Sequence, residues 1–284
     1  LDPEHNYPFI GRGTLELELS GEAALITGAA NGIGFAIAEQ FAQEGCDVHL
    51  WDRSPSVAST AKLISEKYSV SAKWQKIDLG SESQVSQAVD QLSETAARPV
   101  TRVVHAAAIG SGYFGFPFTN LKPADWVKPL QVNMMGMVHL AHYLTPLLLQ
   151  QNAGSFVFIG SVAGQIGSQT DPPYSATKAA NLNYMQCMAK DLAKHHIRVN
   201  MVCPGMVKTE LAESVWKSWS NQQADPNAVS FEDWAEEKIG SIIPLGSWQS
   251  PSDIANMVLF LSSNRAAQVT GQVVNVDGGY VMHW

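Results

Sequence analysis

A serine, a tyrosine and a lysine in the middle of the chain are the residues whose types and spacing most clearly suggest chemistry. Tyr174 and Lys178 lie four residues apart in a stretch of helical character, and Ser161 follows an apolar run typical of a buried strand. Because four residues span about one helical turn, the lysine ammonium can approach the phenol and lower its pKa from about 10. Such a phenol can exchange a proton with an alcohol or a developing alkoxide, while Ser161 can hydrogen-bond the same oxygen.

The same three residues also admit less specific interpretations. A tyrosine and a lysine four residues apart occur on many helices, where the lysine usually packs its stem against the ring. Ser161 lies near glycines, as a hydrolase nucleophile would, but the run from Gly160 to Gly164 misses the G-x-S-x-G pattern by one position. Hydrolysis is therefore disfavoured. The tyrosine–lysine pair indicates a catalytic site only if the sequence also contains a second functional motif.

A glycine-rich turn near the amino terminus supplies that second site. Residues 27–34 read T-G-A-A-N-G-I-G and join an apolar run directly to a segment of helical period. Glycines let backbone N–H groups approach a phosphate, and the helix N-terminus adds partial positive charge. The turn predicts a dinucleotide-phosphate site, with a simple packing turn as the alternative. The predicted contacts are Gly28, Asn31, Gly32, Ile33 and Gly34.

Carboxylates after the next two expected strands indicate where the rest of a dinucleotide would lie. Asp52 stands 18 residues after Gly34, where it can accept hydrogen bonds from the adenosine ribose and would repel a 2′-phosphate. The turn contains no lysine or arginine, and only Arg53 follows the acid, so NAD is favoured over NADP. A solvated strand end is the alternative for Asp52. Asp78 is placed to bond the adenine amino group, with capping of the next helix as an equal alternative.

The elements that must position these residues follow a regular alternation. Short apolar runs alternate with longer segments of helical period, which is typical of βαβ units. We therefore expect an α/β, doubly wound Rossmann-type fold, with helices on both faces of a seven-stranded parallel sheet. Helix starts are expected at a capping box from Ser81 to Gln84 and at a cap, proline and acid from Ser250 to Asp253. The expected strands are residues 23–27, 47–51, 72–77, 102–106, 155–159, 198–203 and 272–276.

Two stretches break the alternation, and both follow strands at the sheet edge where open parallel sheets bind ligands. One is the glycine- and aromatic-rich loop 110–118, and the other, residues 206–249, predicts a substrate lid after the sixth strand. The aromatic side chains of both can either enclose a substrate or fill core and subunit contacts, and the sequence leaves both readings open. Those of the longer stretch include Trp216, Trp219, Trp234 and Trp248.

The expected domain organisation is simple. Residues 1–20 are predicted to form an N-terminal extension, in which residues 15–19 alternate like a short strand or an extended arm. Residues 21–284 are predicted to form a single catalytic domain that includes the lid.

Composition excludes several classes of function. The 284 residues are 45% hydrophobic and 15% charged, and the net charge of -8 with no lysine or arginine run argues against nucleic acid. The apolar runs are too short to span a membrane, and no signal-peptide pattern is present. Cys46, Cys187 and Cys203 match neither a disulfide framework nor a zinc ribbon. They predict reduced core residues in a cytoplasmic protein, and no metal site.

Together these motifs resemble the single-domain short-chain dehydrogenases/reductases over about residues 20–280. The glycine turn follows T-G-x-x-x-G-x-G, Tyr174 and Lys178 form a Y-x-x-x-K pair after Ser161, and Asn133 begins an N-x-x-G sequence. The resemblance implies a catalytic tetrad of these four residues. In it Asn133 holds a relay water, Tyr174 is the general acid/base, and Lys178 also binds the nicotinamide ribose. The resemblance further implies a homo-oligomer, either a tetramer or a dimer.

The resemblance also places cofactor contacts after the third, fourth and sixth strands. One departure concerns the family's N-N-A-G run after the fourth strand, which here begins at His105 and reads H-A-A-A. In the family that run contains an asparagine that stabilises the sheet, and this chain lacks it. Ala108 in place of glycine narrows the space beside the cofactor ribose. His105 is predicted to be a core histidine. The further contacts expected are Leu79, Ala106, Ala107, Ala108, Pro204, Gly205, Val207 and Thr209.

The expected function is an NAD(H)-dependent oxidoreductase that interconverts a secondary alcohol and a ketone by hydride transfer on a small-molecule substrate. A reductase of carrier-tethered 3-oxoacyl groups is one alternative, which would be expected to prefer NADPH and to carry basic residues at its entrance. A sugar epimerase or dehydratase fits less well, because that branch spaces its glycine turn differently. A catalytically idle NAD-binding protein is the alternative from a different class.

Overall fold

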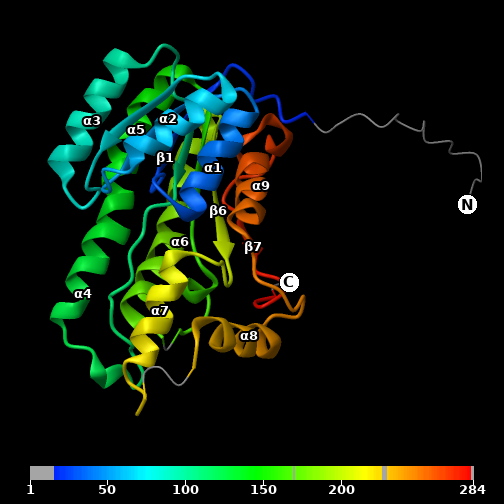
Figure 1. The fold of residues 1–284 in the computed structure, drawn as a ribbon. Coiled ribbons are helices and arrows are strands. Elements are labelled where there is room, and N and C mark those ends of the chain that lie inside the picture. The colour runs from blue at the N-terminus through cyan, green and yellow to red at the C-terminus, as the bar shows by residue number, and fades with distance from the viewer. Residues whose placement is uncertain (1–15, 169, 226–228, 283–284) are drawn as a thin grey trace, which may run out of the picture.

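A parallel sheet is the frame of the molecule (Figure 1). In the part of the chain that the computed structural model describes, residues 16–168, 170–225 and 229–282, seven strands pair in the order β3-β2-β1-β4-β5-β6-β7. All six pairings are parallel, and the strand order reverses beside β1, so the predicted doubly wound Rossmann-type fold is confirmed. The strands are β1 (Ala23–Thr27), β2 (Asp47–Asp52), β3 (Ala72–Lys76), β4 (Arg102–His105), β5 (Gly154–Ile159), β6 (Ile197–Pro204) and β7 (Val273–Val276).

Helices cover both faces of this sheet, because each crossover between parallel strands must return over one face (Figure 1). Three helices pack on one face: α1 (Gly32–Gln43), α2 (Val57–Tyr68) and α9 (Pro251–Ser262). Three others pack on the opposite face: α3 (Glu82–Thr95), α5 (Gly136–Gln151) and α6 (Pro172–Leu192). Among the helices of the described residues, none is long and apolar enough to cross a membrane.

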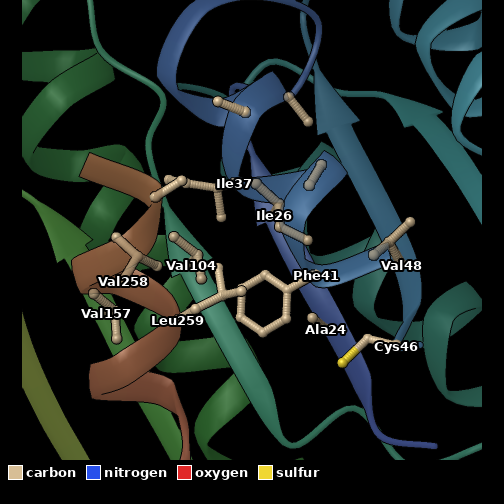
Figure 2. Close-up of a cluster of buried hydrophobic side chains, with 14 of the residues drawn as sticks. Ala24, Ile26, Ile37, Phe41, Cys46, Val48, Val104, Val157, Val258 and Leu259 are labelled. Atoms are coloured by element: carbon tan, nitrogen blue, oxygen red, sulfur yellow. The ribbon is translucent and has the colours of Figure 1, made fainter. Parts of the chain in front are cut away.

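The core divides into two large clusters, one on each side of the sheet. Figure 2 shows the first, where the Phe41 ring of α1 lies between β1 and the side chains of α9. Ile26, Phe41 and Val258 have no exposed surface. On the other face Phe156 and Phe158 of β5 stack with their ring centroids 5.9 Å apart. The strands are buried on both faces, which explains their continuous apolar runs.

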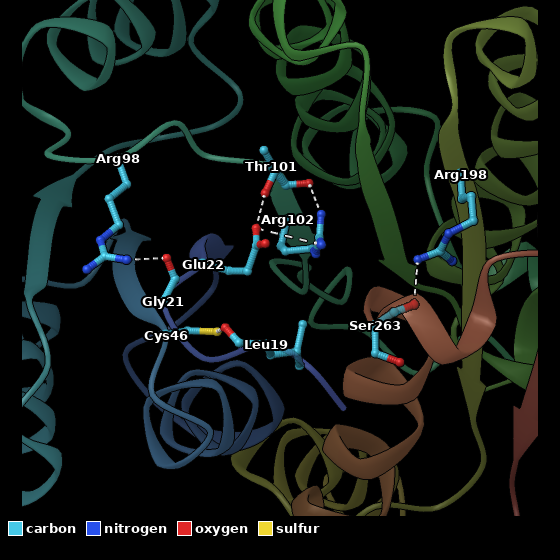
Figure 3. Close-up of polar contacts among 9 residues, drawn as sticks. All are labelled: Leu19, Gly21, Glu22, Cys46, Arg98, Thr101, Arg102, Arg198 and Ser263. Carbon is cyan, nitrogen blue, oxygen red and sulfur yellow. Dashed lines mark hydrogen bonds and ion pairs between the residues drawn. The ribbon is translucent and has the colours of Figure 1, made fainter. Parts of the chain in front are cut away.

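Polar contacts close the sheet at the ends where the strands begin (Figure 3). Arg198 of β6 donates to the backbone carbonyls of Leu261 and Ser263 at the carboxyl end of α9. Burial lowers the pKa of Arg198 to about 10. Arg102 of β4 lies 3.7 Å from Glu22, whose carboxylate also accepts a hydrogen bond from the Thr101 hydroxyl. A cation beside the carbonyls that end a helix is stabilising, so Arg198 ties the start of β6 to the end of α9. Arg102 and Thr101 tie the start of β4 to Glu22, which precedes β1.

The described part of the N-terminal extension runs as an arm and not as a strand. Residues 1–15, including the first residue of the alternating 15–19 segment, lie outside the described residues. The Glu16 carbonyl accepts a hydrogen bond from Arg265, and the Glu18 carboxylate lies 3.1 Å from the same guanidinium. Residues 16–19 thus form no strand, and Leu19 at their end is buried in the core.

Two local predictions were wrong. The expected capping box at Ser81 does not form: the Ser81 side chain accepts no hydrogen bond from the helix, and Gln84 instead accepts from the Asp78 N–H group at 2.9 Å. The box at Ser250 and Asp253 does form, with reciprocal bonds of 3.2 and 2.7 Å. Cys187 is exposed on α6 and is therefore not a core residue, whereas Cys46 and Cys203 are buried.

The stretch predicted as a lid leaves the sheet and returns to the same point. Val207 and Gln249 form an isolated parallel bridge, and the Gln249 N–H donates to the Met206 carbonyl at 3.0 Å. Between these residues lie α7 (Glu210–Ser220) and α8 (Phe231–Ile242), which pack together at the end of the molecule toward which β6 points (Figure 1).

Aromatic side chains of this stretch form a third, smaller core. Trp234 and Phe231 are buried, and neighbouring ring centroids lie 5.8 to 6.3 Å apart. The four tryptophans therefore hold α7 and α8 together, which favours the core reading of these residues. Tyr113 and Phe116 in the loop 110–118 are more than half exposed, at 56% and 52%.

Replacing Phe41 with alanine is expected to destabilise the protein by about 3–5 kcal/mol, because the ring is fully buried and its cavity cannot collapse between a strand and two helices. Leu63→Ala on α2, where the side chain is 48% exposed, is the control and should change stability by about 0.5 kcal/mol or less. Urea unfolding followed by circular dichroism measures both. Equal losses in the two variants would contradict the packing described here.

Candidate active site

The predicted site residues meet at one edge because every strand of the sheet runs in the same direction. The glycine turn follows β1, Asp52 ends β2, Ser161 follows β5 and Pro204 ends β6. Residues far apart in the sequence thus share the carboxyl edge of the sheet, which is where ligands bind in folds of this class. Tyr174 and Lys178 reach that edge from the first turns of α6.

The glycine turn is built by two close backbone approaches. A Cβ atom on Gly28, whose φ is +68°, would lie 2.7 Å from the Ala107 nitrogen, and one on Gly34 would lie 2.0 Å from the Gly28 carbonyl oxygen. The first bond of α1 runs from the Phe35 N–H to the Asn31 carbonyl. The N–H groups of residues 32–34 therefore precede the helical ladder and have no helical partner. Three N–H groups without a helical partner, at a helix N-terminus in a glycine-rich turn, fit a pyrophosphate.

Asp52 is fastened to the glycine turn. Its two carboxylate oxygens accept hydrogen bonds from the Ala30 N–H at 3.0 Å and the Ser54 N–H at 2.7 Å. Each oxygen keeps a second lone pair, so the carboxylate can still accept from a ribose hydroxyl. Arg53 is exposed beside it. Asp52 lies at the end of β2, where the sequence predicted it. Its carboxylate is half-buried and accepts from two backbone amides, which differs from the freely solvated strand end considered as the alternative.

Asp78 and Leu79 follow β3 on the same edge. The Asp78 carboxylate accepts from the Gly80 N–H at 2.9 Å and makes no cap to α3, so of its two predicted roles the capping one is wrong. Leu79 is buried, and its carbonyl oxygen is hydrogen-bonded to His139 Nδ1 at 2.9 Å. Its side chain thus belongs to the core, and only its backbone remains for a cofactor.

The remaining predicted cofactor contacts line the space between the glycine turn and α7. Ala106 donates to the Thr27 carbonyl, and Ala107 lies against Gly28, which places Ala108 just beyond the turn. Thr209 begins α7, with its methyl group 3.6 Å from where a Gly32 Cβ would stand. The others are Pro204, Gly205 and Val207, at the end of β6 and in the bridge to Gln249.

Lys178 is buried beneath the tyrosine. Its ammonium donates to the Ile159 carbonyl at 2.7 Å and lies 5.5 Å from the centroid of the Tyr174 ring. Burial lowers the pKa of Lys178 to about 8, although the nearby Cys203 opposes this shift. His105 is a core histidine, as expected: it is hydrogen-bonded to the Thr27 hydroxyl at 2.9 Å, and burial lowers its pKa to about 3.

The pKa of Tyr174 differs from the expectation. Burial raises it above its usual value, and Asp171 and Cys203 raise it further, while a hydrogen bond with Ser161 lowers it. The net shift of the Tyr174 pKa is therefore upward, opposite to the expected depression, and burial is its largest cause. Ser161 accepts from the Ala163 N–H at 3.1 Å, so its own hydrogen can point to the tyrosine or to a substrate oxygen.

Asn133 lies in a short π-helix (Leu130–Met135) and does not face Tyr174 through its side chain. Its amide accepts from the Ile109 N–H at 2.9 Å and donates to the Ile109 carbonyl and to the Thr177 hydroxyl. Its backbone carbonyl accepts from Asn181 at 2.9 Å. Both amide hydrogens are thus used to tie the segment after β4 to α6, and the water-holding role stays a prediction.

Sequence reasoning missed two residues at this edge. Asp171 caps α6, accepting from the Tyr174 N–H at 3.2 Å and from the Ser111 N–H at 2.7 Å. An acid followed by two prolines is a helix-start signature that could have revealed it. Glu210 of α7 accepts from the Asn31 side chain at 3.1 Å and so links the lid to the glycine turn. No sequence signal connects two residues that far apart.

Comparison with known proteins assigns the family. The family model described as enoyl-(acyl carrier protein) reductase matches residues 28–281. A 3-oxoacyl-(acyl-carrier-protein) reductase of Aquifex aeolicus is 32% identical over 266 residues, which cover 93% of this chain and 99% of that protein. A sorbose reductase of Candida albicans is 29% identical over 277 residues, covering 96% and 92%.

Solved structures agree with this assignment. The crystal structure of L-sorbose reductase from Gluconobacter frateurii, complexed with NADPH and L-sorbose, has a TM-score of 0.86 at 26% identity, covering 95% of this chain and 100% of that one. The chain therefore belongs to the short-chain dehydrogenase/reductase superfamily, an oxidoreductase family with a Rossmann-type nucleotide-binding fold.

Replacing Gly28 with alanine is expected to weaken NADH binding at least roughly ten-fold, because the methyl group would strike the Ala107 backbone and a φ of +68° disfavours side chains. Gly240→Ala is the matched control, since a Cβ at this position in α8 would meet nothing within 4 Å. Fluorescence titration with NADH compares the two. Unaltered affinity in the Gly28 variant would argue that the turn does not hold the cofactor.

Proposed function

We propose that this protein is an NAD(H)-dependent oxidoreductase that interconverts a secondary alcohol and a ketone, with Tyr174 as the general acid/base. The observation that carries the proposal is the meeting of Ser161, Tyr174 and Lys178 beside the glycine turn, with the lysine 5.5 Å from the ring centroid and hydrogen-bonded to the Ile159 carbonyl. The relatives named as sorbose reductase and 3-oxoacyl reductase support a reaction between carbonyl and alcohol groups.

The residues present fit a nicotinamide dinucleotide. The N–H groups of residues 32–34 would receive the pyrophosphate, Asp52 the adenosine ribose, and Lys178 the second ribose. A bound dinucleotide would supply or accept the hydride. NAD is favoured over NADP because the Asp52 carboxylate would face a 2′-phosphate at like charge, although Arg53 lies exposed next to it and the Gluconobacter relative was complexed with NADPH.

In the reductive direction Tyr174 gives its phenolic proton to the substrate oxygen as that oxygen gains charge. Ser161, held by the Ala163 N–H, donates to the same oxygen and orients it. The Lys178 ammonium then stabilises the phenolate left behind. In the oxidative direction the same groups work in reverse, and Tyr174 must first lose its proton. The role of Asn133 in passing that proton onward is part of the proposal.

A reductase of carrier-tethered 3-oxoacyl groups is the second candidate, because the Aquifex relative carries that name. The acidic first turn of α7, with Glu210 and Glu213, speaks against a site that receives an acidic carrier. Turnover of an acetoacetyl thioester on a carrier or a small pantetheine mimic, set against polyols and simple ketones, separates the two candidates.

Several broader features belong to the same proposal. We infer that residues 206–249 act as a lid over the substrate, since both ends of the stretch meet at the Val207–Gln249 bridge. We also infer a homo-oligomer, which the family resemblance supports, and a cytoplasmic location, which the free cysteines support. Sedimentation analysis of the purified chain tests the first of these two.

The Tyr174→Phe variant is expected to lose at least about a hundred-fold in kcat while binding NADH as the wild type does, because only the proton donor is removed. Since burial raises the pKa of Tyr174, alcohol oxidation should quicken as pH rises from about 7 to 10, and ketone reduction should be favoured at the lower end. Absorbance of the reduced nicotinamide measures both. Wild-type turnover in the variant would show that Tyr174 is not the proton donor, whereas NADH binding without turnover in both proteins would support an idle NAD-binding protein.

The Asp52→Asn variant is expected to shift the ratio of NADPH to NADH affinity at least roughly ten-fold toward NADPH, because the repulsion of a 2′-phosphate is lost. Asp78→Asn is the control: it neutralises the carboxylate after the neighbouring strand and should change both affinities alike. Titrations of each variant with both cofactors give the ratios. An unchanged ratio in the Asp52 variant would refute its role in selecting the cofactor.

A further inference from the structure

The start of α6 is joined to the loop 110–118 by one carboxylate. Asp171 uses its two oxygens on two different segments: Oδ1 accepts from the Tyr174 N–H at 3.2 Å, and Oδ2 accepts from the Ser111 N–H at 2.7 Å. A Cβ atom on Gly110 would lie only 2.9 Å from Oδ2, so the loop backbone approaches the carboxylate closely. A carboxylate can accept at both oxygens, whereas an amide side chain can accept at only one.

We propose that Asp171 is a positioning residue that locks the loop 110–118 onto the first turn of α6 and thereby sets the substrate against Tyr174. The proposal rests on the proposed function, because Tyr174 is taken as the group that exchanges a proton with the substrate. Among the described residues, the hydrogen bonds of the Asp171 carboxylate come from the backbone N–H groups of Ser111 and Tyr174, so Asp171 acts through the loop and the helix.

The loop 110–118 contacts both the start of α6 and the predicted lid. The Gly115 N–H donates to the Thr170 carbonyl at 2.9 Å, a second tie next to Asp171. From the other side, Ser218 of α7 donates to the Gly112 carbonyl and Gln222 to the Phe114 carbonyl, each at 3.3 Å. The lid, the loop and the tyrosine helix thus form a continuous chain of contacts, and the Asp171 carboxylate is a link within it.

The charge of Asp171 has a second effect on the tyrosine. It raises the pKa of Tyr174 in the same direction as burial and as Cys203 on β6, while the hydrogen bond with Ser161 lowers it. Lys178 lies across the ring, and His105 behind the lysine is uncharged near neutral pH because burial lowers its pKa to about 3. Removing the negative charge of Asp171 therefore moves the pKa of Tyr174 downward.

A helix cap alone would explain one of the two bonds but not the other. Asparagine caps helices as well as aspartate does, so a residue that served only as a cap would tolerate the replacement. A positioning residue would not, because the amide nitrogen of asparagine would confront the second N–H group. Asp171→Asn thus separates the two roles without removing the cap.

Three variants test the proposal. Asp171→Asn keeps the cap and loses both the loop bond and the charge. Gly110→Ala pushes the loop away from Oδ2 but keeps the charge. Asp253→Asn is the control, because Asp253 caps α9, which packs on the face of the sheet opposite to α6. The readouts are kcat and KM against pH for alcohol oxidation, the NADH affinity, the thermal midpoint, and hydrogen exchange of the amides in residues 110–118.

The expected results differ between the variants. Asp171→Asn should lower kcat/KM at least roughly ten-fold, chiefly through KM, and move the acid limb of the oxidation profile to lower pH. Gly110→Ala should raise KM without moving that limb. Both should speed exchange of the loop amides and leave NADH affinity within about two-fold of wild type. The control should match the wild type in every activity readout.

The failures are distinguishable. Wild-type kcat/KM, an unmoved acid limb and unchanged loop exchange in Asp171→Asn would show that the residue is a cap and nothing more. If the wild type turns over no alcohol or ketone, the proposed function fails. The hydrogen-exchange data still test whether Asp171 holds the loop 110–118: unchanged exchange at the Ser111 amide in both Asp171→Asn and Gly110→Ala would overturn the proposal.

Discussion

The parallel pairing of β1 with both β2 and β4 is the constraint on which the site depends. Because β1 is hydrogen-bonded on both sides, its end is the point where the chain must turn away between two neighbouring strands. The turn has to pass the Ala107 backbone so closely that only glycine fits at position 28, and α1 must then begin with its N–H groups facing the same gap. An anion site thus follows from strand pairing together with the steric limits of the backbone.

The same direction of all strands also brings the proposed proton-transfer residues to the sheet edge that carries the glycine turn. Ser161 leaves β5 two strands away from the glycine turn, and α6 passes over the sheet so that Tyr174 and Lys178 stand above it. Lys178 is buried where an ammonium has little solvent, and it is held there by the Ile159 carbonyl at the end of the adjacent strand. Burial of the ammonium is unfavourable and lowers the pKa of Lys178. In the proposed function, this buried charge stabilises the phenolate of Tyr174.

The stretch that contains α7 and α8 forms a separate unit beside this frame. The described residues between 206 and 249 carry their own aromatic core, and their two ends meet at the Val207–Gln249 bridge. They contact the rest of the molecule through Asn31, the loop 110–118 and the Gly278 carbonyl, which accepts from the Leu245 N–H at 3.0 Å. A unit built this way can change its surface without disturbing the sheet. Relatives named for sorbose and for carrier-bound acyl groups share this frame, which agrees with specificity that resides in the attached segments.

The residue pattern alone was sufficient for the fold class, the seven strands to within about two residues, the glycine turn and the position of Asp52, because each depends on local periodicity or short spacing. The residue pattern could not predict features that depend on contact between two segments far apart in the sequence. The hydrogen bonds of Asp171 to Ser111 and of Glu210 to Asn31, and the engagement of Asn133 with Ile109, join such segments. The raised pKa of Tyr174 and the failed cap at Ser81 are also of this kind, since burial and competing partners are set only when the chain has folded.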